Sequence, residues 1–583
     1  MVNGYSVVVV ALVLVATVAI GTYGFRISRT TSDFYVASRS IPPFLNASAI
    51  GGEYLSAASF LGVAGLIFAF GPDMLWFPVG YTVGYLVLLV FVAAPLRRSG
   101  AYTLPDFAES RLESLPVRRV ASVLTVGVGW LYLLPQLQGA GLTLRTVTGA
   151  PPWLGPVLVA VIVCANVAAG GMRSITFVQA FQYWFKFAAI AIPVVFIVLA
   201  WRAGGAPSIG GPHPPAFQNQ TTVTLQQAVR VHAPEPVLVQ ATGVVDGRRY
   251  DHQDTPLEVG DHDVGGQTQL VFPAGAAVPQ VSSIDAVSND RWALPLDGGG
   301  TPRSLYLTYS LIIATFLGTM GLPHVVVRFY TNPNGRAARR TTLVVLGLLG
   351  IFYLIPTVYA ALGRLYAPEL LLTGQTDAVV LLLPSRLIGG VGGQILGALV
   401  AGGAFAAFLS TSSGLTVTVA GVLSQDVLRL RGGIRSFRLA TVLAAAVPCA
   451  AALFVTGLPV ADVVGLAFAV AASSFCPLLV LGIWWRRLTS VGAAAGMLVG
   501  GGLALGAGLC TLVVHLGEGW LRDLMVRPAA WTVPLGFAAM IAGSLATPGR
   551  VAHNVTSTMT RLHVPEGLGL ASTEQHPRTR DED

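Results

Sequence analysis

Long apolar runs alternate with short polar links along most of the chain. A helix that crosses a hydrocarbon core of about 30 Å needs roughly 20 apolar residues. This length predicts about thirteen transmembrane helices, at approximately 5–24, 44–70, 74–95, 119–143, 152–170, 176–201, 304–322, 342–363, 390–427, 437–457, 460–485, 490–516 and 529–547. So many long apolar runs, joined by short links, are not found in soluble folds.

The amino-acid composition agrees with this pattern. Hydrophobic residues make up 54% of the 583 positions and charged residues 11%, whereas an ordinary soluble domain has about 25% charged residues. So little charge cannot cover the surface of a soluble fold of this size, which excludes a water-soluble enzyme. The sequence therefore predicts an all-α polytopic membrane protein in the lipid bilayer.

The formal net charge of +8 rests on arginine, because Lys186 is the only lysine. The arginines are scattered over short links instead of forming a basic patch, so no nucleic acid partner is expected. Cytoplasmic links of membrane proteins are rich in arginine. The alternation predicts a multi-pass plasma-membrane protein with its N-terminus outside and its C-terminus cytoplasmic. The links assigned to the cytoplasm include Arg97, Arg98, Arg111, Arg118, Arg119, Arg173, Arg328, Arg336, Arg486 and Arg487.

One long polar segment, at about 203–303, separates the sixth and seventh apolar runs, and the charge pattern places it outside the cytoplasm. Apolar triplets at 237–239 and 270–272, between Gly, Asp and Pro clusters, are compatible with short strands of a small cap. A partly ordered insertion with no direct role in the chemistry is an equally good interpretation. The polar tail at 548–583 is expected to be flexible.

Two apolar runs contain residues that interrupt a membrane helix. The run at 44–70 carries Gly51, Gly52 and Glu53, and the run at 304–322 leads into Gly-Leu-Pro at 321–323. A freed backbone carbonyl is costly in lipid unless it faces protein, water or an ion. With the first run set aside, each interrupted run is the first of a group of five. Paired interruptions of this kind are typical of inverted-repeat transporters with a site halfway across the membrane.

A third polar group lies in the run at 390–427, where Ser410, Thr411, Ser412 and Ser413 are adjacent. Hydroxyls in a helix also bond to carbonyls of the preceding turn, and this interpretation is equally good for the cluster taken alone. Adjacent hydroxyls together with freed carbonyls suit a hard monovalent cation such as sodium, and they suit a soft transition metal poorly.

Several motifs make the chain similar to a known family. They are Ser32-Asp33-Phe34-Tyr35, Tyr54-Leu55-Ser56-Ala57-Ala58-Ser59-Phe60-Leu61-Gly62, Gly170-Gly171-Met172-Arg173, Gly318-Thr319-Met320-Gly321-Leu322-Pro323-His324 and Arg328-Phe329-Tyr330-Thr331. With these motifs the sequence resembles the solute:sodium symporter family. The Tyr54–Gly62 and Gly321–His324 runs resemble its cation/acetate (monocarboxylate) branch. The resemblance covers about 30–550 without the 203–303 segment.

The resemblance implies a LeuT-type fold, in which two inverted repeats of five helices are preceded by one extra helix and followed by two. On this chain the expected parts are an extra N-terminal helix at 1–30, a first repeat at 31–202, an extracytoplasmic insertion at 203–303, a second repeat at 304–485, two extra C-terminal helices at 486–547 and a cytoplasmic tail at 548–583.

The family also implies a sodium site between the first and eighth core helices. Carried over to this sequence, its ligands are the backbone carbonyls of Gly52, Leu55 and Ala407 and the hydroxyls of Ser410 and Thr411. Sugar-transporting relatives have an acidic residue, linked to a further cation site, where this chain has Gln179. A second cation is therefore not expected.

A bound carboxylate needs hydrogen-bond donors or a cation. The expected substrate-binding residues lie around the interrupted helices and are Glu53, Tyr54, Ser56, Ser59, Gln136 and Thr319. Lys186 is assigned to the cytoplasmic end of its run, where it would snorkel to the interface. With no lysine or arginine expected at the middle of the membrane, sodium and helix N-termini would supply positive potential. Glu53 faces away from the substrate, is protonated, or belongs to an ion path.

These observations predict a secondary active transporter and not an enzyme. We expect cation-coupled symport of acetate or another short-chain monocarboxylate by alternating access, with sodium as the coupling ion and no other cofactor. The alternatives are sodium symport of an amino acid or other organic acid, and proton-coupled monocarboxylate uptake. A membrane sensor is disfavoured because the tail is too short for a signalling domain. A channel is disfavoured because the polar residues form isolated groups.

Overall fold

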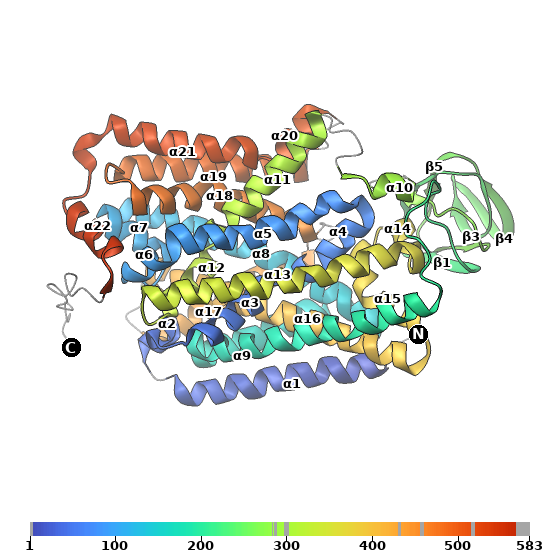
Figure 1. Ribbon diagram of the computed structural model, residues 1–583, viewed down its shortest axis with the longest axis horizontal. Helices are drawn as coiled ribbons and strands as arrows, with labels where there is room; N and C mark the ends of the chain where they lie inside the picture. The colour runs from blue at the N-terminus through green and yellow to red at the C-terminus, as the bar shows by residue number, and fades with distance from the viewer. Residues whose placement is uncertain are drawn as a thin grey trace.

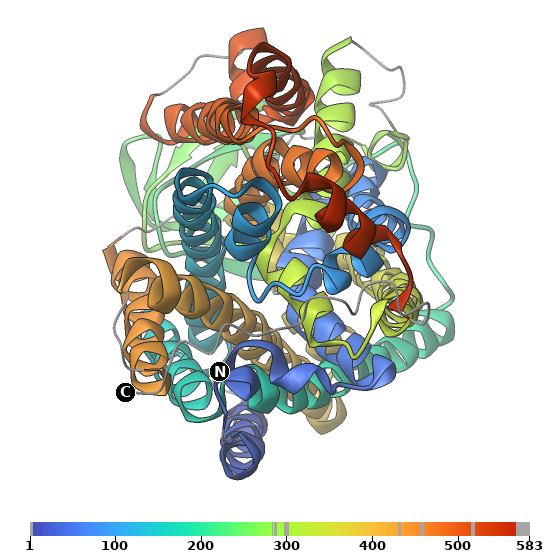
Figure 2. The ribbon, with the colours of Figure 1, turned by 90° about the vertical axis from the view of Figure 1, so that its left-hand side faces the viewer.

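The computed structural model describes residues 4–28, 30–56, 58–282, 284, 288–295, 302–428, 433–454, 460–514 and 519–566. Long helices form a bundle with roughly aligned axes, and a small β-sheet projects from one end of it (Figure 1). Helix α1 (Gly4–Ile27) begins at the end that carries the sheet, whereas α22 (Val555–His563) lies at the opposite end. Figure 2 looks along the bundle from the α22 end. The predicted tail beyond residue 566 lies outside the described residues.

The first half of the chain contains helices interrupted by short turns. After α1 these are α2 (Thr31–Val36), α3 (Pro43–Tyr54), α4 (Val63–Phe70), α5 (Trp76–Val87), α6 (Ala93–Arg98), α7 (Leu104–Leu112), α8 (Leu115–Thr148) and α9 (Leu154–Ala203). Local sequence explains several starts. Thr30 with Asp33, and Thr103 with Asp106, form capping boxes for α2 and α7, which satisfy free backbone N–H groups of the first turn.

The second half begins after the sheet. Its helices are α10 (Asn289–Trp292), α11 (Pro302–Gly321), α12 (Pro323–Val327), α13 (Gly335–Tyr366), α14 (Glu369–Thr373), α15 (Val379–Ile388), α16 (Gly390–Val422), α17 (Ile434–Phe454), α18 (Val460–Trp484), α19 (Ser490–Val513), α20 (Trp520–Val526), α21 (Ala529–Ala546) and α22. Helix α16 consists largely of Gly, Ala, Ser, Thr and Val and is buried along most of its length, as expected for a helix without a polar face.

Eleven helical stretches of the described chain are long and apolar enough to cross a membrane, so the predicted count of thirteen is not confirmed. Two regions account for the difference between the two counts. The 44–70 run is divided between α3 and α4, each too short by itself. The runs at 152–170 and 176–201 lie on the two helical segments of α9, which meet at the non-helical Gly171 and are counted once among the eleven.

Helix α9 bends at Gly171, whose backbone has φ 54° and ψ −150°. This conformation is open to glycine and strained for other residues. A Cβ at this position would also press against the backbone of Phe34 in α2. The Gly-Gly-Met-Arg motif therefore marks a sharp kink, packed against α2, at which the two helical segments of α9 meet.

The polar segment after α9 folds into a seven-stranded antiparallel sheet. Its strands are β1 (Thr221–Leu225), β2 (Val229–Ala233), β3 (Val237–Val245), β4 (Arg248–Leu257), β5 (Gly260–Val264), β6 (Thr268–Phe272) and β7 (Gln280–Val281). The order is β1-β6-β3-β5-β2-β7, and β4 pairs with β3. Asp246 and Gly247, both with positive φ, join β3 to β4, as a two-residue hairpin turn requires. Both apolar triplets lie in strands, so the strand interpretation of this segment is confirmed.

Candidate functional site

The interruption between α3 and α4 releases two backbone carbonyls. In a continuous helix the Ser56 N–H would bond to the Gly52 carbonyl. It donates instead to the Tyr54 carbonyl at 2.8 Å. The Ser59 N–H, which would bond to the Leu55 carbonyl, points to the Ser56 hydroxyl at 3.4 Å. The carbonyls of Gly52 and Leu55 are thereby open to another donor.

That donor is the ammonium group of Lys186 in α9. Its Nζ donates to the Gly52 carbonyl at 2.5 Å, to the Leu55 carbonyl at 2.6 Å and to the Ser410 hydroxyl at 3.3 Å. Lys186 is fully buried. The prediction that it snorkels to the cytoplasmic interface is therefore wrong, because the segment of α9 after Gly171 packs beside α3 and carries this side chain to the interrupted helix.

The other two predicted cation ligands lie beside this contact. The Ser410 hydroxyl donates to the Ala407 carbonyl at 3.0 Å, and the Thr411 hydroxyl donates to the Glu53 carbonyl at 2.6 Å. The structure thus brings the five predicted ligands together between α3 and α16. Three of them, on Gly52, Leu55 and Ser410, contact Lys186.

Glu53 forms a buried ion pair with Arg328, which follows α12. Arg328 Nε lies 2.6 Å from Glu53 Oε2, and both side chains are buried. Arg328 also donates to the Gln179 side-chain carbonyl and, at 3.1 Å, to the Thr176 hydroxyl. Two expectations are corrected here. Arg328 does not belong to a cytoplasmic link, and the middle of the bundle holds both an arginine and a lysine, because Glu53 and the freed carbonyls give these cations partners.

Three of the remaining predicted substrate residues, Tyr54, Ser56 and Thr319, take part in two hydroxyl pairs next to the cation ligands. The Tyr54 hydroxyl lies 2.6 Å from the Thr319 hydroxyl, and the Tyr132 hydroxyl donates to the Ser56 hydroxyl at 3.3 Å. Ser59 and Gln136 are buried. Gln136 lies four residues after Tyr132 on α8, which places both on one helix face. We call Tyr54, Ser56, Tyr132 and Thr319 the hydroxyl cluster.

Aromatic rings enclose Tyr54. Its ring meets Tyr85 edge-on at a centroid distance of 4.9 Å, and Tyr81 and Phe468 lie at 5.8 and 6.4 Å. The apolar body of the cluster is therefore packed by α5 and α18, while its hydroxyls point toward polar partners. Apolar walls with a few convergent polar groups are typical of sites for small organic molecules.

Sequence reasoning missed Arg328, Lys186 and Tyr132, although a signal existed for Lys186. An ionisable residue within a transmembrane run is a functional candidate by default. Thr176, Gln179 and Lys186 also recur at spacings of three and seven residues, which places them on one face of α9. That face packs against α3 and α16.

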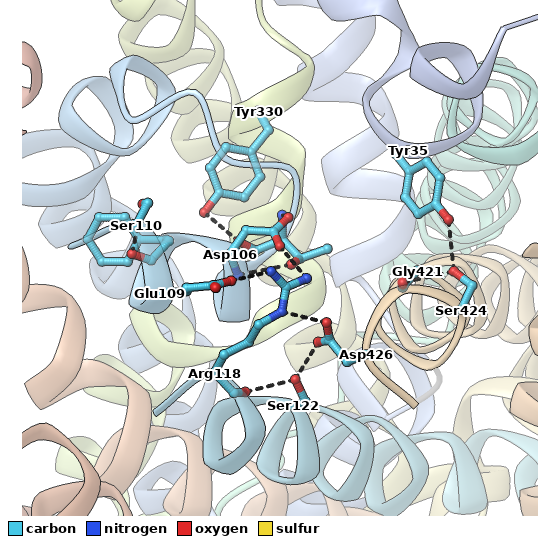
Figure 3. A network of polar contacts seen from close by, with 12 residues as sticks. Tyr35, Asp106, Glu109, Ser110, Arg118, Ser122, Tyr330, Gly421, Ser424 and Asp426 are labelled. Carbon is cyan, nitrogen blue, oxygen red and sulfur yellow. Dashed lines mark hydrogen bonds and ion pairs between the residues drawn. The ribbon is translucent and has the colours of Figure 1, made fainter. Parts of the chain in front are cut away.

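A second polar network lies toward the end of the bundle that holds α7 and α22 (Figure 3). Arg118 of α8 pairs with Asp106 at 2.7 Å, with Glu109, and with Asp426 at 2.6 Å. Asp426 lies in the turn at 423–427 that continues α16, and it accepts a hydrogen bond from Ser122. Arg118 thus ties α7, α8 and the end of α16 together.

We expect Arg118→Gln to lower the thermal stability of the purified protein. The change leaves three carboxylates facing one another without a cation, at a cost of about 2 kcal/mol for partly exposed groups. The measurement is the melting temperature in detergent. Arg119→Gln is the matched control, because Arg119 is an exposed neighbour on the same helix. Equal melting temperatures for the two variants would contradict the assignment of Arg118 as a structural tie.

Comparison with known proteins places this arrangement in a family. The sequence model of the sodium:solute symporter family matches residues 34–209 and 261–500. The stretch between them, 210–260, contains β1, β2, β3 and β4. Most of the sheet is therefore an addition to the part that the family shares.

Individual relatives cover nearly the whole chain. An uncharacterized symporter of Cupriavidus necator is 30% identical over 92% of this chain and 91% of its own length. A monocarboxylic acid transporter of Corynebacterium glutamicum is 30% identical over 93% of this chain and 90% of its own length.

The structure also resembles a solved transporter. A Na⁺-coupled sialic acid symporter, in a substrate-bound outward-open state, matches with a TM-score of 0.62 at 14% identity, over 94% of this chain and 97% of that chain. This likeness confirms the expected LeuT-type fold class. The protein is thus a multi-pass membrane transporter and not an enzyme, and it belongs to the sodium:solute symporter family.

Proposed function

We propose that this protein is a cation-coupled symporter that takes up acetate or another short-chain monocarboxylate, such as propionate or pyruvate. The observation that carries the proposal is the interrupted α3, in which Ser56 of the hydroxyl cluster directly follows Leu55, whose carbonyl binds the buried ammonium group of Lys186. A small carboxylate needs hydrogen-bond donors and positive charge for its oxygens and an apolar wall for its short chain. The 30% identity to a monocarboxylic acid transporter supports the same substrate class.

The proposed mechanism is alternating access. Residues 31–202 and 304–485 would form the two inverted repeats, and rocking of one helix group against the other would open the site to each side in turn. The cation ligands on α3 and α16 and the hydroxyl cluster are neighbours, because Leu55 precedes Ser56 directly. Cation and substrate binding can therefore favour the same conformation through their differential affinity for the two states.

Two coupling ions are candidates. Sodium is supported by the family and by the five oxygens of Gly52, Leu55, Ala407, Ser410 and Thr411. Proton coupling is the second candidate, and the observation that favours it is the ammonium of Lys186 among those oxygens.

For the orientation, we propose that the β-sheet end lies outside the cell and the α22 end in the cytoplasm. Helices α6 and α7 lie toward the end opposite the sheet (Figure 1), and they carry Arg97, Arg98 and Arg111. Arginine enrichment on one side of a plasma membrane marks the cytoplasmic side. This arrangement places the N-terminus of α1 outside.

The test is uptake of labelled acetate by the purified protein in liposomes. We expect saturable uptake that unlabelled propionate and pyruvate inhibit. Thr319→Val removes the hydroxyl that bonds to Tyr54, so the acetate concentration for half-maximal uptake should rise about tenfold.

Thr308→Val is the control for this variant. Thr308 lies on the same helix about three turns before Thr319 and outside the hydroxyl cluster. Acetate uptake without inhibition by propionate or pyruvate would narrow the substrate to acetate. An absence of acetate uptake, or an unchanged half-maximal concentration in Thr319→Val, would count against the proposed substrate class or site.

A further inference from the structure

The ammonium group of Lys186 has the hydrogen-bonding geometry of a bound cation. An ammonium carries three N–H donors and no acceptor. In this structure all three donors have partners, namely the carbonyls of Gly52 and Leu55 and the hydroxyl of Ser410. These partners are three of the five oxygens proposed as cation ligands. The ammonium group of Lys186 is thus stabilised by oxygen atoms that would otherwise surround a coupling ion.

The charges around the site also disfavour a sodium ion beside Lys186. Glu53 follows Gly52, whose carbonyl binds Lys186, and the Glu53 carboxylate is already paired with Arg328 at 2.6 Å. Arg328 also donates to Gln179 and Thr176, so its guanidinium group is held by these partners and by Glu53. Two buried cations and one buried anion leave one positive charge in surplus, and that surplus lies on Lys186. A sodium ion on the same carbonyls would add a second unpaired cation a few ångströms away, where repulsion in a low-dielectric interior is strong.

We propose that Lys186 takes the place of a coupling cation in the five-oxygen site, so that the protein transports its substrate without sodium bound at this position. The inference deepens the proposed function, on which its transport readout rests. Because the ammonium is tethered to α9, it is not released on either side of the membrane during a cycle. No sodium ion is then carried across the membrane from this site, which favours proton-coupled monocarboxylate uptake.

The tethered ammonium also explains how an anionic substrate is accepted without a sodium ion. Its surplus positive charge lies at the Leu55 carbonyl, one residue before the Ser56 hydroxyl. A carboxylate bound by the hydroxyl cluster would neutralise that charge. Substrate and lysine would therefore stabilise one another, and α9 would sense the substrate through the same side chain that holds α3 and α16.

The experiment compares the unmodified protein with Lys186→Met and with the double variant Lys186→Met/Ser410→Ala. Methionine keeps an unbranched side chain of similar length and removes the charge. Uptake of labelled acetate into liposomes is measured in sodium chloride and in choline chloride at equal ionic strength. The melting temperature of each purified protein in detergent is measured in the same two salts.

The unmodified protein should transport equally well in the two salts and melt at the same temperature in both. In choline chloride, the uptake by Lys186→Met should be at least about tenfold lower than that by the unmodified protein. In sodium chloride its uptake should recover. Sodium should also raise the melting temperature of this variant, because an ion that binds the folded state stabilises it. The double variant should lose the recovery by sodium, since it lacks one of the sodium-binding oxygens.

A saturable stimulation of the unmodified protein by sodium, in uptake or in melting temperature, would overturn the proposal. Recovery by sodium that persists unchanged in the double variant would overturn it as well. If Lys186→Met is not recovered folded, the response of the unmodified protein to sodium decides the question. Failure of the proposed function is a separate result: no monocarboxylate is taken up in either salt, while the melting temperatures still report whether sodium binds.

Discussion

Arg328→Met is expected to destabilise the folded protein by about 3–5 kcal/mol, the usual consequence of removing one partner from a buried ion pair. The variant leaves the Glu53 carboxylate buried without a cation, and it removes the donor that binds Gln179 and Thr176. The measurement is the melting temperature together with the fraction of monodisperse protein after size-exclusion chromatography. Most of the variant should aggregate or melt far below the unmodified protein.

A second substitution tests the physical reason. Glu53→Gln in the Arg328→Met background removes the unpaired negative charge, so the double variant should regain part of the lost stability. If the two substitutions were simply additive, the ion pair would not be the cause. A melting temperature of Arg328→Met equal to that of the unmodified protein would contradict the buried position of Arg328.

Gly52→Ala is expected to abolish transport and to destabilise the protein by about 1–3 kcal/mol, as overpacking of a filled interior does. A Cβ on Gly52 would collide with the backbone carbonyl of Gln179. A backbone carbonyl in a helix cannot turn aside, so α3 would have to move away from α9. That movement would separate the carbonyls of Gly52 and Leu55 from Lys186.

Gly127→Ala is the matched control for this change. Gly127 lies within α8, and a Cβ there would meet nothing within 4 Å. By helix propensity alone, alanine in place of glycine stabilises a helix by about 1 kcal/mol. On that basis both substitutions should stabilise their helices. If Gly52→Ala lowers stability and uptake while Gly127→Ala does not, the contact of residue 52 with α9 is the cause of the loss. Transport by Gly52→Ala at the level of Gly127→Ala would show that this close contact is not needed.

The interruption of α3 and the oxygens around it could be predicted from the sequence. A continuous membrane helix is disfavoured by Gly51, Gly52 and Glu53 in the middle of an apolar run. These residues are adjacent, so the sequence alone shows the interruption. The Ser-Thr cluster of α16 is equally local. The structure brings both segments together, and Ser410 meets the freed carbonyls through Lys186.

The burial of Lys186 could not be predicted in the same way. Hydropathy separates apolar runs wherever small or polar residues intervene, as they do at 170–175. The structure has a kink at Gly171 and a continuous helix on either side of it. Lys186 therefore lies near the middle of the segment between Gly171 and Ala203 instead of at the end of a span, and the interpretation of its side chain changed with that position.

The sequence by itself determined that this protein is a membrane transporter with a helix broken at Gly52–Ser56, because apolar length, scarce charge and glycine-rich breaks are properties of neighbouring residues. The tertiary structure alone decided which charges meet there. Lys186 is separated by 134 positions from Gly52, and Arg328 by 275 from Glu53. A buried charge is stable only with a partner. Partners so distant in the chain are brought together by the packing of α3, α9, α12 and α16, which cannot be predicted from a local sequence pattern.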